Sequence, residues 1–166
     1  MKCASKLLPI CLIVLGFVCT GCTSSSTRQL EENKALVRRA FNAWNEKNWE
    51  ILEELYAPDY VCHLPVSPEP LTNKESEEFM RTFLAAFPDY SHMIEDMIAE
   101  DDKVVTRFTI SGTHKGEYMG IPSTGKEMEL TSIMISRIAD GKIVEEWQEF
   151  DEYSFMRQLG AIPSDQ

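Results

Sequence analysis

The main change of period in the hydrophobic pattern of this chain falls at Pro88, and this change constrains the fold more than any other feature. Before Pro88, apolar residues recur every three or four positions, which is the spacing of one helix face. After Pro88, apolar and polar residues tend to alternate, as in strands with one buried face. Helices followed by long strands predict an α+β fold with a mainly antiparallel sheet, because parallel strands need long crossover connections.

The same periods place the individual elements. Helices are expected at residues 28–45, 48–56, 74–87 and 152–159. Strands are expected at residues 60–64, 90–99, 103–114, 126–139 and 142–151. Thr72 or Asn73 could cap the third helix. Asp140 and Gly141 predict a hairpin turn, because glycine accepts the positive φ of a primed turn.

A long curved sheet wrapped around amphipathic helices leaves a cavity between the two layers. Aromatic side chains from both layers are expected to line or close it. They are Phe41, Trp44, Trp49, Phe79, Phe83, Phe87 and Trp147. Tyr118 and Met119, on a glycine-rich loop, could contact a ligand or plug the cavity. The sequence therefore predicts a binding site for a small hydrophobic molecule.

The last expected strand supplies a candidate acid/base. Side chains alternate along a strand, so Trp147, Glu149 and Asp151 share one face. With a two-residue turn at Asp140 and Gly141, the residues opposite these three are Met134, Ser132 and Leu130, respectively. A carboxyl group among apolar residues has a raised pKa, which suits proton transfer. Alternatively, Asp151 caps the helix that begins at Glu152.

The N-terminus has the pattern of a secretory signal. Lys2 and Lys6 form a short basic start, and residues 7–18 are almost wholly apolar. This run is shorter than the roughly 20 residues of a membrane-spanning helix. A buried N-terminal helix is the alternative.

Residues 18–22, with the sequence VCTGC, resemble a lipobox, in which the final cysteine is lipidated after cleavage. The expected organisation is a signal peptide at 1–22, a flexible polar tether at 23–30 and one domain at 31–166. A lipid on Cys22 would anchor the protein to a bacterial membrane at the cell envelope.

Charge and cysteine content exclude several classes. The net charge is −11, and loss of Lys2 and Lys6 would make it more negative, so binding to nucleic acid is not expected. Four of the five cysteines lie at or before Cys22. Cys62 therefore cannot form an intrachain disulfide in the mature domain, and we expect a packed free thiol rather than a nucleophile.

Motifs for metals and cofactors are missing from the sequence. His63, His92 and His114 are scattered, without the spacing of a zinc site. There is no GxSxG, GxGxxG or P-loop motif. The sequence thus favours a site without a cofactor.

Four stretches, in this order, resemble the SnoaL-like polyketide cyclase (ester cyclase) family of the nuclear-transport-factor-2-like superfamily. They are NKALVRRAFNAWNEKNWEILEELYAPDYVCH, AAFPDY, SGTHKGEYMGIPSTGKEMEL and RIADGKIVEEWQEFDEYSFMRQLGAIP. The resemblance implies a cone of three helices on a curved sheet, often dimeric through the sheet. It also implies a cofactor-free aldol cyclase with an acid/base at the end of the last strand, here Asp151.

Two of the three histidines, His63 and His114, are candidate site residues. His63 is expected at the mouth of the pocket, where it could act with Asp151 or donate a hydrogen bond to a substrate oxygen. His114 precedes the loop with Gly116, Gly120 and Gly125, which could form a lid. Either histidine could instead be structural, His114 as a surface residue at a bend.

Three hypotheses of different classes follow. The first is a cofactor-free enzyme acting on a small hydrophobic carbonyl compound, with Asp151 as acid/base. The second is a non-catalytic envelope lipoprotein that binds an apolar ligand in the same cavity. A third is an envelope interaction protein with a vestigial cavity.

Overall fold

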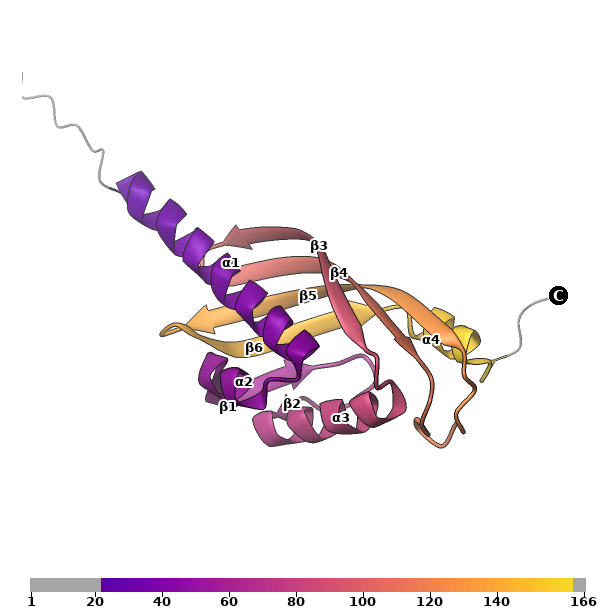
Figure 1. Cartoon of the computed structure of the whole chain (residues 1–166). Coiled ribbons are helices and arrows are strands. Elements are labelled where there is room, and N and C mark those ends of the chain that lie inside the picture. The colour runs from indigo at the N-terminus through magenta and orange to yellow at the C-terminus, as the bar shows by residue number, and fades with distance from the viewer. Residues whose placement is uncertain (1–21, 163–166) are drawn as a thin grey trace, which may run out of the picture.

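The computed structural model describes residues 22–162 (Figure 1). Its helices are α1 (Cys22–Glu46), α2 (Trp49–Leu55), α3 (Asn73–Ala86) and α4 (Glu152–Leu159). Its strands are β1 (Tyr56–His63), β2 (Leu71–Thr72), β3 (Ser91–Glu100), β4 (Lys103–Thr113), β5 (Glu127–Ala139) and β6 (Lys142–Phe150). Helices before Pro88 and long strands after it confirm the predicted α+β class.

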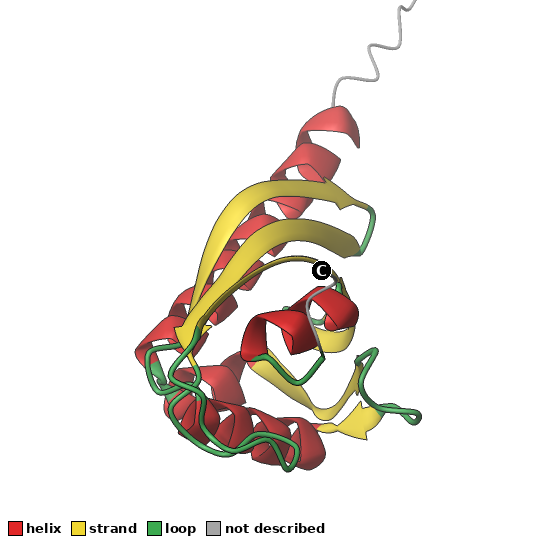
Figure 2. Cartoon of the chain, turned by 90° about the vertical axis from the view of Figure 1, so that its right-hand side faces the viewer, coloured by secondary structure: helices red, strands yellow, loops and turns green. Residues whose placement is uncertain are grey.

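The strands form one curved sheet in the order β2-β1-β6-β5-β4-β3. Only β1 and β6 pair in parallel, and all other neighbours are antiparallel. The sheet curls without closing, and α4 lies near its open end (Figure 2). This arrangement confirms the predicted cone of helices packed against a strongly curved sheet.

Local sequence explains where two of the helices begin and end. At α3, Thr72 Oγ1 accepts the Glu75 N–H, and the Glu75 carboxylate accepts the Thr72 N–H in return. This capping box confirms Thr72 as one of the two predicted caps. The α4 helix begins after Asp151 and ends at Gly160, whose φ of 80° closes the helix in the left-handed region.

The β5–β6 hairpin begins as predicted and then departs from the expected register. Asp140 and Gly141 have φ values of 50° and 73°, and Ala139 pairs with Lys142, as in a two-residue primed turn. A bulge follows, because Ile138 pairs with Ile143 whereas Arg137 pairs with Glu145. Val144 is therefore an extra residue, and a shift of one residue exchanges the two faces of a strand.

The α1 helix begins earlier than predicted. Its backbone is helical from Cys22, whereas the sequence pattern predicted a helix from residue 28 behind a flexible polar tether. Serine and threonine cost only a few tenths of a kcal/mol each in a helix, and extending a helix that is already nucleated is easy. The predicted signal peptide, apart from Cys22, lies outside the described residues. Between residues 22 and 162, none of the helices combines the length and hydropathy needed to cross a membrane.

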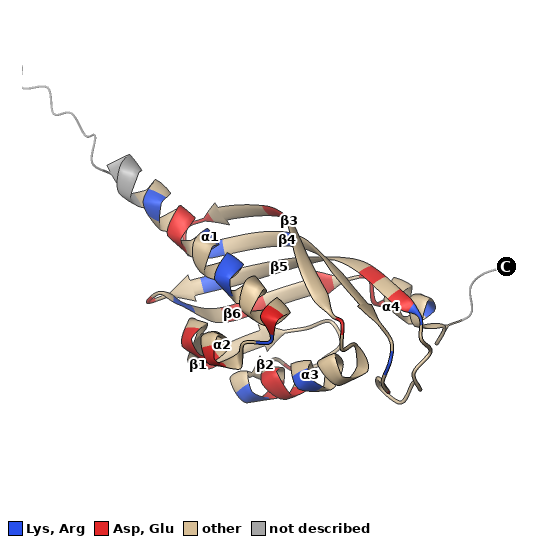
Figure 3. Cartoon of the chain, in the orientation of Figure 1, with Lys and Arg blue, Asp and Glu red and all other residues tan. Residues whose placement is uncertain are grey.

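The core lies between the helices and one face of the sheet. Phe87 is completely buried, and its ring stacks on that of Phe83 with centroids 4.6 Å apart. Phe41 of α1 meets Phe108 of β4 edge to face, at 4.9 Å, and so joins the helical layer to the sheet. Acidic and basic residues are interspersed along α1 and α3 (Figure 3).

Candidate functional site

A cavity of about 610 Å³ lies between the helices and the inner face of the sheet. This volume is within the range of small-molecule sites. Its apolar wall includes Phe41, Trp44, Trp49, Leu52, Leu64, Phe79, Met80 and Met134. Two polar side chains of β6, Glu146 and Gln148, also line it. We call this space the main cavity.

Glu146 is a carboxyl group buried at the wall of the main cavity, with 3 % of its surface exposed. Its Oε2 accepts hydrogen bonds from the Tyr60 hydroxyl at 2.8 Å and the Tyr56 hydroxyl at 3.3 Å. Its Oε1 accepts one from the Ser136 hydroxyl at 2.6 Å. Burial raises the pKa of Glu146, and the hydrogen bonds from Ser136, Tyr60 and Tyr56 partly oppose that rise.

The groups around Glu146 are held neutral. Burial, with the nearby Glu146 charge, raises the pKa of both Tyr56 and Tyr60 well above the usual value. The same two causes raise the pKa of the Cys62 thiol to about 12. Cys62 is a buried free thiol, as predicted, and this pKa argues against a nucleophilic role at neutral pH. Trp44 Nε1 donates to the Tyr56 hydroxyl at 3.1 Å, which fixes that ring.

His92 also lines the main cavity. Its ring packs against those of Phe41 and Phe108, with centroids 5.1 and 5.3 Å away, and its Nε2 contacts the Tyr90 hydroxyl. Burial lowers the pKa of His92 to about 3, so the ring is neutral at physiological pH. The sequence showed His92 only as one of three scattered histidines and gave no sign of this position.

The predicted acid/base, Asp151, lies outside the main cavity. Its side chain is exposed, and its Oδ1 accepts the Ser154 N–H at 2.9 Å, as the cap of α4. The prediction that Asp151 faces the pocket was therefore wrong, and the capping alternative describes its contacts. Phe150 is the last residue of β6 and faces inward, so Asp151 would fall on the opposite face even if the strand continued.

Trp147 was also assigned to the wrong face. It pairs with Ile135 instead of Met134, because the bulge at Val144 shifts β6 by one residue. The inner set is consequently Glu146, Gln148 and Phe150. Trp147 and Glu145 lie on the face opposite the main cavity.

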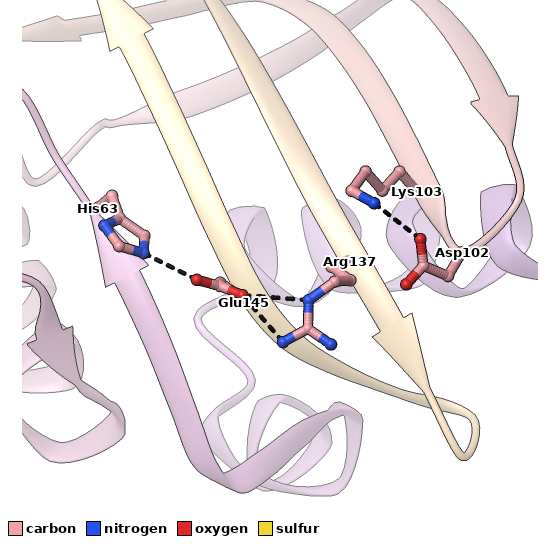
Figure 4. Close-up of polar contacts among 5 residues, drawn as sticks. All are labelled: His63, Asp102, Lys103, Arg137 and Glu145. Carbon is pink, nitrogen blue, oxygen red and sulfur yellow. Dashed lines mark hydrogen bonds and ion pairs between the residues drawn. The ribbon is translucent and has the colours of Figure 1, made fainter.

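His63 lies beside Trp147 on that opposite face, so its predicted place at the mouth of the pocket was wrong. The two rings stack with centroids 5.3 Å apart. His63 Nε2 is 3.0 Å from Glu145 Oε1, and Arg137 donates to Glu145 Oε2 at 2.9 and 3.1 Å (Figure 4). Burial would raise the pKa of Glu145, but the hydrogen bonds from His63 and Arg137 outweigh it and lower that pKa. Asp102 and Lys103 form a separate ion pair near Arg137, with atoms 3.0 Å apart.

The other predicted ligand-binding residues divide into two groups. Trp44 and Met134 line the main cavity, and Tyr118 and Leu130 line a smaller space beside it. His114 lines neither and is completely buried, so it is not a surface residue. Its ring stacks on Phe87 with centroids 5.2 Å apart, and its Nδ1 is 3.1 Å from Thr124 Oγ1. These contacts tie the loop between β4 and β5 to the core.

The smaller space has a volume of about 40 Å³. We call it the apolar recess and define it by Phe83, Ile110, Tyr118, Leu130, Phe150 and Phe155. It also shares wall residues with the main cavity, namely Leu64, Phe79, Met80, Tyr90 and Gln148. The two spaces therefore adjoin.

The described residues contain no group of three or more His, Cys, Asp or Glu side chains arranged to hold a metal ion. The polar groups that line the main cavity include the buried carboxyl group of Glu146, the hydroxyls of three tyrosines and the amides of Asn73 and Gln148. These groups can transfer a proton and donate hydrogen bonds to a carbonyl oxygen.

Comparisons with known proteins agree on one family. The sequence model of the SnoaL-like polyketide cyclase family matches residues 34–159. Aklanonic acid methyl ester cyclase DnrD of Streptomyces peucetius is 31% identical over 129 residues, covering 75% of this chain and 88% of that protein.

Solved structures give the same result. IdmH of Streptomyces antibioticus, a candidate polyketide cyclase, superposes with a TM-score of 0.71 at 34% identity, over 77% of this chain and 98% of that one. AclR of Streptomyces galilaeus, a candidate hydroxylase, has a TM-score of 0.73 at 30% identity, over 81% and 99%. One fold thus carries more than one assigned activity.

Proposed function

Because this chain belongs to the SnoaL-like polyketide cyclase family, we propose that it is a cofactor-free enzyme acting on a small hydrophobic carbonyl compound. The observation that carries this proposal is the buried carboxyl group of Glu146 at the wall of an aromatic cavity. Glu146 takes the acid/base role that the sequence alone assigned to Asp151. DnrD acts on aklanonic acid methyl ester, and an aromatic ketone or ester of that general kind suits the aromatic walls.

The chemistry follows from the position of Glu146. Its carboxylate removes a proton from the carbon next to a carbonyl, and the resulting enolate carbon attacks a second carbonyl carbon of the same molecule. The protonated Glu146 then returns the proton to the new alkoxide, which closes the ring. A raised pKa makes the carboxylate a stronger base and keeps the acid available for the second step.

The test is proton exchange, because it isolates the first step and needs no knowledge of the natural substrate. We expect the protein to accelerate exchange of the α-protons of 2-tetralone in D₂O, followed by ¹H NMR. The rate should rise with pH, because only ionised Glu146 accepts a proton, and its midpoint should lie above the usual glutamate value of about 4.3. No acceleration over buffer, with either 2-tetralone or aklanonic acid methyl ester, would exclude the enzyme.

A non-catalytic binding module is the second candidate, and the hydrogen bonding of Glu146 favours it. Three hydroxyls already donate to this carboxyl group, which is the arrangement of a satisfied structural residue. The same experiments separate the two candidates. Ligand binding without α-proton exchange supports the binding module.

We also propose that the protein is anchored at the cell envelope through a lipid on Cys22. The support is the sequence of residues 1–22, with its basic start, apolar run and lipobox-like end. Two acyl signals hold a protein firmly to a membrane. Cells that express the chain should incorporate labelled palmitate into it, and the Cys22→Ser variant should not. Equal labelling of both proteins would refute the anchor.

A homodimer formed through the outer face of the sheet is the third part of the proposal. Three large apolar side chains on the face opposite the main cavity are exposed: Met93 (60%), Ile98 (64%) and Ile133 (48%). A two-fold dimer buries the same patch on both copies, so one patch is sufficient.

Substituting Ile133, one of these three exposed residues, tests the dimer. We expect Ile133→Glu to give a monomer in sedimentation velocity at concentrations where the wild type is dimeric, because paired carboxylates repel and are poorly solvated. Asn42→Glu, at an exposed position of α1, is the matched control and should leave the dimer intact. A wild-type monomer at every concentration would contradict the proposal.

A further inference from the structure

Gln148 occupies the boundary between the two spaces, because it lines both the main cavity and the apolar recess. One of its amide hydrogens is used, since Nε2 donates to Ser132 Oγ at 3.1 Å. Ser132 in turn donates to the Glu149 carbonyl at 2.8 Å, so the amide is held in place. Within residues 22–162, the amide oxygen of Gln148 has no hydrogen-bond partner, and neither has its second N–H.

We propose that Gln148 binds the substrate carbonyl through its second N–H and that the apolar recess takes a short apolar substituent attached to that carbonyl. This inference rests on the proposed function only in taking the ligand to be a carbonyl compound. It assigns the ligand an orientation, with a ring in the main cavity, the carbonyl at Gln148 and a small alkyl group in the apolar recess.

The position of Gln148 relative to Glu146 fits this orientation. The two residues are separated by one position on β6 and lie on the same face, about 6.5 Å apart along the strand. A carbonyl oxygen held at Gln148 places the neighbouring carbon on the side of Glu146 or on the side of the apolar recess. The carbon that faces Glu146 is the one that can lose a proton.

The volume of the apolar recess limits the length of the substituent. A site for one water needs about 10–15 Å³ by the same measure, so 40 Å³ has room for roughly three water-sized groups. A methylene group occupies a similar volume. The recess therefore fits a chain of roughly three carbons, and its walls of Phe83, Leu130 and Phe155 offer that chain apolar contacts.

A series of alkyl phenyl ketones tests the inference by binding alone. Acetophenone, propiophenone, butyrophenone, valerophenone and hexanophenone differ only in the alkyl group on the carbonyl. We expect the Kd from isothermal titration calorimetry to fall about fourfold per added methylene up to butyrophenone and then to level off. A flat series, or an unbroken gain through hexanophenone, would overturn the recess.

One variant fills the recess and another enlarges it, so the two should change the binding of long-chain ketones in opposite directions, which a misfolded protein would not do. Leu130→Phe fills the recess and should weaken the binding of butyrophenone, while the Kd of acetophenone stays within about twofold of the wild-type value. Phe150→Leu enlarges the recess and should move the plateau to a longer chain. Leu52→Phe adds the same bulk to the main cavity and serves as the matched control, since it should weaken all five ketones equally. If Leu130→Phe weakened the binding of all five ketones equally, that result would also overturn the inference.

The role of Gln148 has its own variant. Gln148→Leu keeps the size of the side chain and removes the N–H. The Kd of every ketone should therefore rise by the same factor, about fivefold, while its dependence on chain length persists. An unchanged Kd would remove Gln148 from the inference. These binding results are independent of α-proton exchange. A Kd that falls with chain length up to butyrophenone, without α-proton exchange, supports the recess and not the enzyme. Exchange together with a Kd that does not depend on chain length supports the enzyme and not the recess.

Discussion

Replacement of Glu146 by glutamine is expected to slow enzyme-catalysed α-proton exchange of 2-tetralone by at least 100-fold. The amide cannot accept a proton from carbon, and loss of a positioned general base typically costs a factor of 10² to 10⁴. The residue keeps its size, so the cavity keeps its shape. The measurement is the pseudo-first-order exchange rate, followed by ¹H NMR at a pH on the plateau of the wild-type profile.

The chain supplies its own control for this substitution. Glu145→Gln makes the same chemical change one residue earlier, but Glu145 lies on the opposite face with His63 and Arg137. It should leave the exchange rate within about twofold of wild type, as should Asp151→Asn at the cap of α4. Equal losses in Glu146→Gln and Glu145→Gln would point to a general effect on folding, and a loss confined to Asp151→Asn would return the acid/base role to Asp151.

The largest loss of stability is expected from Phe87→Ala. Phe87 is completely buried, and its ring lies within 6 Å of the rings of Phe83, His114, Tyr118 and Phe155. Truncation of a buried phenylalanine removes its transfer free energy and leaves a cavity, at a cost of about 3–5 kcal/mol. We expect the free energy of unfolding in urea to fall by that amount.

Phe79→Ala is the comparison for Phe87→Ala. Phe79 is half-buried at the wall of the main cavity, and the only ring near it among the described residues is that of Phe83, 6.5 Å away. Phe79→Ala should lower the free energy of unfolding by less than half as much as Phe87→Ala, because water can fill the space that the Phe79 ring leaves. Similar losses in the two variants would mean that the stack around Phe87 is not the centre of the core.

The features that the sequence predicted well are those encoded within a few residues. The capping box at Thr72 and Glu75 depends on two residues three positions apart, and the turn at Asp140 and Gly141 depends on the backbone preference of glycine. The helix at Glu152–Leu159 was predicted to the residue, since its cap and its closing Gly160 both stand beside it.

The candidate site was harder to predict because its contacts join distant parts of the chain. Tyr56 and Tyr60 lie 90 and 86 positions before the glutamate to which they donate. The inner face of β6 depends on the bulge at Val144, and no glycine or proline in the strand marks the position of that bulge. Without the bulge, simple alternation selects Trp147 and Asp151.

The extra residue at Val144 decides which of two sets of β6 side chains faces the main cavity. The inner set is Glu146, Gln148 and Phe150, and the outer set is Glu145, Trp147 and Glu149. With the bulge, Ser136 pairs with Glu146, whereas regular pairing of the same residues would place Glu145 opposite Ser136 and turn Glu145, Trp147 and Glu149 inward. A relative that lacks the residue at Val144 would keep Glu146, Gln148 and Phe150 inward without a bulge, whereas a relative that keeps this residue but pairs regularly would present the other set to a ligand. An alignment of the family should be anchored on the bulge before any residue of this strand is assigned a role.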